Sequence, residues 1–149
     1  MIGRLLGSGD LAGARSAARR MVEIGAGAGV LFGVAILALH GVLPHLFTDD
    51  PRVVTVAGLL LVWVGLMQPL SAVVFVLDGV LMGAGDMRFL AQAMVGAAAV
   101  FAAAACALIV TGAGVGWLWA ALTLLTVARL AALTARVHGN AWLVPGPTR

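Results

Sequence analysis

Residues 51–82 read PRVVTVAGLLLVWVGLMQPLSAVVFVLDGVLM, and this stretch decides the fold. No charged residue occurs between Arg52 and Asp78. A helix needs roughly 20 apolar residues to cross the hydrocarbon core of a bilayer, so this stretch is long enough to span it with some tilt. Pro69 lies near the middle and removes one backbone hydrogen bond, which predicts a kink. We therefore expect a kinked transmembrane helix over residues 53–82.

Three further apolar runs flank this one, over residues 21–44, 89–111 and 115–137. The chain of 149 residues is 62% hydrophobic and 10% charged, with a mean hydropathy of +1.11. A soluble domain carries about 25% charged residues and has no core large enough to bury so much apolar surface. Short connections make successive helices antiparallel neighbours. The predicted fold class is therefore an all-α integral membrane protein with four antiparallel transmembrane helices.

Every basic residue is an arginine, and the distribution of the arginines predicts the orientation. In a four-span arrangement, the following fall on one side: Arg4, Arg15, Arg19, Arg20, Arg88, Arg136 and Arg149. Arg52 falls on the other side, and Arg129 lies inside the fourth span toward the arginine-rich end. Cytoplasmic loops are enriched in arginine, so both termini are expected in the cytoplasm of a multi-pass protein of the cell membrane. Residues 1–20 then form a cytoplasmic loop or amphipathic segment, 21–137 the membrane region and 138–149 a cytoplasmic tail.

Composition and aromatic residues add two expectations. The net charge of +3 is scattered along the chain instead of gathered on one face, so a nucleic-acid partner is excluded and the lipid bilayer is the expected surrounding. Trp117 and Trp119 are expected at the outer membrane interface and Trp142 near the inner one, as in an aromatic belt.

An internal repeat links two turns of the chain. Residues 3–11 (GRLLGSGDL) and 79–87 (GVLMGAGDM) share five of nine positions, 76 residues apart. Glycine supplies the left-handed conformation that ends a helix, and the aspartate, Asp10 or Asp86, is expected to cap the helix that follows. The second copy ends a predicted membrane helix, whereas no helix is predicted before the first. This asymmetry predicts that the chain is a fragment of a longer membrane protein.

One face of the second span carries polar side chains. Gln68, Ser71, Phe75 and Asp78 fall within about 80° of arc at 100° per residue, and they are the candidates for a substrate or ion path. An aspartate inside a span is a functional candidate, and Arg129 is its expected charge partner. The alternatives are that Asp78 is hydrated near the cytoplasmic end, that Arg129 extends to the interface, and that Gln68 joins helices.

Glycines in the first span predict close helix packing. Gly25, Gly29 and Gly33 repeat every four residues, which allows another backbone to approach. No nucleophile elbow, zinc-protease motif, paired cysteines or phosphate loop is present in the sequence. We therefore expect neither an enzyme nor a metal site.

Several motifs together carry a resemblance to a known family. The stretch GRLLGSGD at residues 3–10, Gln68-Pro69, and FVLDGVLMGAGD at residues 75–86 resemble multidrug and toxic compound extrusion (MATE) transporters, and look closest to the DNA-damage-inducible-F-like branch. Residues 48–51, TDDP, resemble an outer loop of the same family. The resemblance covers nearly the whole chain, and the order and spacing of its motifs agree.

The resemblance implies more than the residues do alone. It implies a twelve-helix fold of two lobes, of which the four spans are helices nine to twelve, so that the N-terminal lobe is missing. It implies export of small organic, often cationic, compounds in exchange for H⁺ or Na⁺, with no other cofactor. In some branches a carboxylate follows the position of Gln68 by about one turn; Ser71 stands in that region here, which argues against an ion site of that kind.

Two other classes of protein share these features. A flippase for lipids or lipid-linked precursors has a similar helix pattern, but it is expected to carry more cationic residues in its cavity. A small non-transport membrane protein could assemble through the glycine face. Substrate accumulation assays and cross-linking distinguish these alternatives from an efflux transporter.

Overall fold

The computed structural model describes residues 1–112 and 115–144, and these are helical apart from short connections. The elements in order are α1 (Ile2–Gly7), α2 (Leu11–Leu39), a 3-10 helix η1 (Leu43–Leu46), α3 (Pro51–Gly83), α4 (Met87–Val110) and α5 (Val115–His138). Four of the described helices, α2, α3, α4 and α5, are long and apolar enough to cross a membrane. The predicted all-α membrane fold is confirmed.

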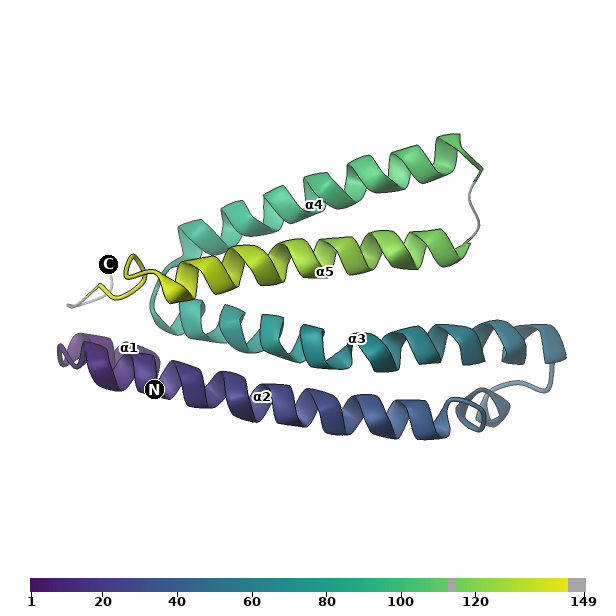
Figure 1. The fold of residues 1–149 in the computed structure, drawn as a ribbon, viewed down its shortest axis with the longest axis horizontal. Coiled ribbons are helices and arrows are strands. Elements are labelled where there is room, and N and C mark those ends of the chain that lie inside the picture. Colours follow the sequence, from purple (N-terminus) through teal and green to yellow (C-terminus); the bar gives the residue numbers. More distant parts are fainter. Residues whose placement is uncertain (113–114, 145–149) are drawn as a thin grey trace.

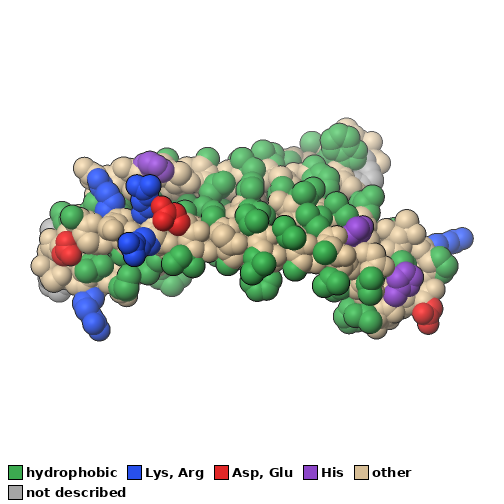
Figure 2. Space-filling view, turned by 60° about the horizontal axis from the view of Figure 1, so that its bottom comes forward, with side chains coloured by type: hydrophobic (Ala, Val, Ile, Leu, Met, Phe, Trp, Pro, Cys, Tyr) green, Lys and Arg blue, Asp and Glu red, His purple; other side chains and the backbone are tan. Residues whose placement is uncertain are grey.

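The long helices form two antiparallel hairpins, α2 with α3 and α4 with α5 (Figure 1). α3 contacts both α2 and α5 and therefore lies at the centre of the arrangement. The α1–α2 turn, the α3–α4 loop and the end of α5 lie together at one end of the bundle (Figure 1). Charged side chains gather at this end, while apolar side chains cover the middle of the molecule (Figure 2).

The boundaries of α2 differ from those of the predicted first span. The helix begins at Leu11, so it includes half of the predicted cytoplasmic segment, and it ends at Leu39 instead of Pro44. Pro44 lies in the first turn of the separate 3-10 helix η1, which begins at Leu43, and a proline is tolerated there because the N–H groups of a first turn have no helical partner. The next helix, α3, begins two residues before the predicted span: the Asp50 side chain accepts a hydrogen bond from the Arg52 N–H at 2.8 Å, and Pro51 is the first helical residue.

The two copies of the repeat have the same backbone conformation. Gly9 and Gly85 have φ angles of 80° and 79°, in the left-handed region that favours glycine. In both copies the aspartate N–H donates to the carbonyl five residues earlier, Asp10 to Leu5 and Asp86 to Leu81. In the first copy, residues 3–7 belong to the short helix α1, which corrects the expectation that no helix precedes the turn. Each copy is therefore a helix end followed by a helix start.

The buried core lies at the charged end of the bundle. Its largest fully buried side chains come from four parts of the chain: Leu6, Val80, Leu81, Leu133 and Trp142. In the most apolar stretch of each spanning helix, only 6% to 11% of residues are buried within the chain. Most of the apolar surface is therefore available to lipid or to other helices.

Trp142 differs from its prediction as an interfacial residue. It is 1% exposed, and its Nε1–H donates to the Val137 carbonyl at 2.9 Å. Trp142 is therefore part of the buried core at the end of α5. Trp119 is half-buried beside α3, while Trp117 is 63% exposed. An indole that packs on its own chain is indistinguishable from an interfacial one in the sequence, because both lie just outside an apolar run.

Candidate functional site between α3 and α5

An ion pair joins the two helices beside the buried core, near the end of α3 that leads into α4. Arg129 Nη2 of α5 donates to Asp78 Oδ2 of α3 at 2.5 Å. The side chains are 15% and 19% exposed, respectively. Asp78 Oδ1 is buried and has no hydrogen-bond partner among the described residues. A partly buried carboxylate with one unsatisfied oxygen is costly, which makes it a strong candidate for a functional group.

Further along the same interface, a crevice of about 170 Å³ separates α3 from α5. Gln68 and Ser71 line it from α3, and Thr126 lines it from α5. One wall is closed by Trp63, whose Nε1–H donates to Thr123 Oγ1 at 3.0 Å. The crevice thus offers one amide, several hydroxyls and indole faces, and its lining carries no charged side chain.

The structure brings some of the four candidate residues together and separates others. Gln68 and Ser71 share the crevice, whereas Asp78 lies roughly 10 Å further along the α3 axis than Ser71, at 1.5 Å per residue. Phe75 is 69% exposed and contacts neither the crevice nor the ion pair. The polar face therefore divides into a neutral crevice, an outward aromatic ring and a charged pair.

Sequence reasoning missed a second ion pair on the same side of α5. Arg136 Nε donates to Asp86 Oδ2 at 2.7 Å, and the guanidinium lies 4.8 Å from the centre of the Phe89 ring. The available signal was the spacing of Arg129 and Arg136, since residues seven apart lie on one side of a helix. Two arginines of α5 therefore connect it to α3 and to the start of α4.

The second pair also corrects the predicted role of Asp86. Asp10 caps α2 by accepting from the Gly13 N–H at 2.8 Å, but Asp86 makes no capping bond to α4. The Asp10 carboxylate occupies the space that a Cβ of residue 13 would take. The matching position in the second copy is Phe89, so its Cβ disfavours the same arrangement, and Asp86 turns to Arg136 instead.

The glycines of α2 pack against α3 around its proline. A Cβ added to Gly29 would lie 2.9 Å from the Gln68 carbonyl oxygen and from Pro69 Cα. A Cβ on Gly25 would collide with Val76. The glycine face of α2 thus supports the backbone of the segment of α3 that carries Gln68.

These elements define a multi-pass α-helical membrane protein with a polar, ion-paired seam between two spans. A model of the MatE family matches residues 1–108, and the chain belongs to this family. The matched segment runs from α1 into α4 and includes both copies of the repeat. Family members are transporters and not enzymes, as the resemblance implied.

A curated relative supports the same assignment. The chain is 33% identical over 120 residues to Protein DETOXIFICATION 43 of Arabidopsis thaliana, an alignment that covers 80% of this chain and 23% of the relative. The chain therefore spans less than a quarter of the length of that protein. No solved structure matches the chain significantly.

Proposed function

We propose that this chain is the C-terminal part, helices nine to twelve, of a secondary active multidrug efflux transporter of the DNA-damage-inducible-F-like branch. The observation that carries the proposal is the MatE match, which spans both copies of the repeat and both flanking helix ends. The complete protein exports small organic compounds, preferentially cations, in exchange for H⁺ or Na⁺. It lies in the cell membrane with both termini in the cytoplasm. Family membership favours this function over a small structural membrane protein.

In this proposal, α3 lines part of the substrate path. Gln68 and Ser71 offer hydrogen bonds to a substrate in the crevice, and the exposed ring of Phe75 offers an apolar surface. Transporter sites commonly lie beside irregular helix backbone near the bilayer midplane, and Pro69, inside the continuous helix α3, removes one backbone hydrogen bond beside these residues.

The ion pair supplies the coupling step. With Asp78 ionised, Arg129 holds α5 against α3. Binding of H⁺ or Na⁺ to the carboxylate competes with Arg129 and weakens this contact. Coupling then follows if the ion favours one facing state and the substrate favours the other.

Two measurements test the proposal. Sequencing the coding DNA upstream of Met1 is expected to reveal an open frame for about eight more apolar spans; an in-frame stop immediately upstream would contradict the fragment assignment.

In the complete transporter, Asp78→Asn is expected to reduce efflux of an organic cation from cells at least tenfold. Asp49→Asn, which removes a carboxylate at the opposite end, is the control and should leave efflux unchanged. Normal efflux by Asp78→Asn would reject the coupling role while leaving the family assignment intact.

A further inference from the structure

A groove lies between α2 and α5 at the charged end of the bundle. Both helices pack on α3, and the groove between them has a volume of about 480 Å³. Val73 and Leu77 of α3 line it together with Val22 of α2, Val137 of α5 and Trp142. The interior of the groove is therefore largely apolar, while Glu23 and His138 line it together with Arg15 and Arg19.

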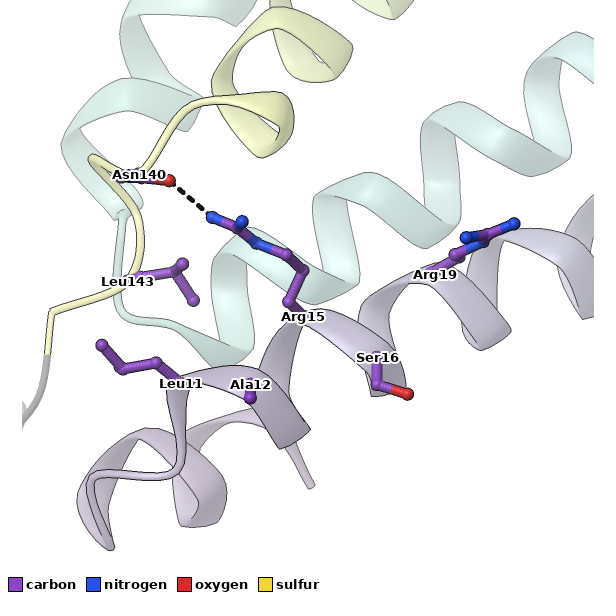
Figure 3. Close-up of a pocket in the computed structure, with 7 residues that line it drawn as sticks. All are labelled: Leu11, Ala12, Arg15, Ser16, Arg19, Asn140 and Leu143. Atoms are coloured by element: carbon purple, nitrogen blue, oxygen red, sulfur yellow. Dashed lines mark hydrogen bonds between the residues drawn. The ribbon is translucent and has the colours of Figure 1, made fainter.

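A wider opening of about 670 Å³ adjoins the groove, and Arg15 and Arg19 line both. Arg15 points toward the segment after α5, where its Nη2 donates to Asn140 Oδ1 at 2.5 Å (Figure 3). Arg15 forms no ion pair with any carboxylate in the described part of the chain. Arg19 pairs with Glu23 at 3.0 Å, and both side chains are largely exposed. The mouth thus carries an uncompensated positive charge.

The charged segment of α2 ends directly before its apolar segment. Its charged residues end at Glu23, and the apolar run begins at Ile24. Arg15 and Arg19 precede this boundary, at the level where a spanning helix meets lipid headgroups, while the groove extends from them toward the apolar side. An amphipathic ligand matches this arrangement, because its anionic head can bind the two arginines and its apolar chain can lie in the groove.

We propose that the groove binds an anionic phospholipid, with its phosphate at Arg15 and Arg19 and part of one acyl chain against Val73 and Leu77. A free phosphate satisfies the arginines but leaves the apolar groove unfilled. A zwitterionic lipid fills the groove but brings its cationic ammonium group toward Arg15. This inference is independent of the transport cycle proposed above, because it depends on the α2–α5 surface and not on the α3–α5 seam.

Tryptophan fluorescence provides the test, because Trp142 lines the groove. The full chain, with Trp63, Trp117 and Trp119 replaced by phenylalanine, is placed in detergent micelles that contain brominated phosphatidylglycerol or brominated phosphatidylcholine. Bromine quenches indole fluorescence at short range. Each arginine near an anionic lipid raises affinity roughly fivefold, so phosphatidylglycerol is expected to quench at a several-fold lower mole fraction. Equal quenching by the two lipids would overturn the proposal.

Matched variants separate headgroup binding from folding. Arg15→Gln is expected to lower the preference for phosphatidylglycerol roughly fivefold, while Arg15→Lys retains most of it. Arg20→Gln removes the same charge from a neighbouring position that lines neither opening, and it should change the preference less. Val73→Phe fills the groove and should reduce quenching by both lipids. Circular dichroism checks that each variant retains its helix content.

Three results would contradict the site. An equal loss of preference in Arg20→Gln and Arg15→Gln would reduce it to general surface charge. Relief of quenching by inorganic phosphate at a concentration no higher than that of the lipid would mean that the acyl chain contributes nothing to the affinity. Quenching of Trp142 in this chain but not in the complete transporter would mean that another protein segment, and not lipid, occupies the groove.

Discussion

The backbone of Gly33 on α2 lies against the Gly65 carbonyl of α3, so closely that a Cβ on Gly33 would sit 2.6 Å from that oxygen. Pro69 has no N–H, so this carbonyl, four residues earlier, lacks its usual helical donor. The glycines of α2 and the proline of α3 are thus one packing feature.

Gly33→Ala is therefore expected to force α2 away from α3. The added methyl overpacks the contact, which should lower the free energy of unfolding by about 1–3 kcal/mol. Reversible unfolding of the chain in mixed micelles, followed by helix content, measures this change. Gly27→Ala is the control, because a Cβ there meets nothing within 4 Å. Equal stability of the two variants would show that the contact does not hold the hairpin.

The Asp78–Arg129 pair predicts a non-additive response. Arg129→Gln leaves a buried carboxylate without its partner, which costs about 3–5 kcal/mol. Asp78→Asn combined with Arg129→Gln removes both charges and should recover most of that loss. Arg19→Gln, at a largely exposed pair, should change stability by less than about 1 kcal/mol. The same unfolding assay compares the variants, and additive losses would show that the pair is not coupled.

Cysteine labelling tests the predicted orientation. The Cys106→Ala background removes the one native thiol. Thr48→Cys, in the connection before α3, should react with a membrane-impermeant maleimide added to intact cells. Ser8→Cys, in the turn before α2, should react only after the membrane is permeabilised. The opposite pattern would reverse the topology and place the arginine-rich end outside.

The sequence predicted the long helices because a span is determined by its own composition. An uncharged run such as 53–77 cannot leave a bilayer without exposing apolar side chains, whatever its neighbours are. The repeat was recognisable for a similar reason, since Gly9 and Gly85 occupy a conformation that few other residues adopt. Features that are local in the chain were therefore predictable.

Features that depend on the distance between helices were harder to predict. Nothing local indicates that α3 lies between α2 and α5, so the groove beside Arg15 and the burial of Trp142 had no signal in the sequence. Arg129 was proposed as the partner of Asp78 from charge alone, and the structure places the two side chains together. Phe75 lies on the same face of α3 as Gln68, but its ring is exposed and does not line the crevice, because α5 covers only part of that face.

The two copies of the repeat predict opposite responses to one substitution. Asp10 is an N-cap, and asparagine caps a helix about as well as aspartate, so Asp10→Asn should leave stability nearly unchanged. Asp86 is instead the ionic partner of Arg136, so Asp86→Asn replaces a charged hydrogen bond and should cost about 1–3 kcal/mol. Unfolding in mixed micelles compares the two variants directly. If neither substitution changes the stability, the Asp86–Arg136 pair contributes nothing to it. If both substitutions lower the stability equally, the presence of Gly13 or Phe89 does not determine the role of the preceding aspartate.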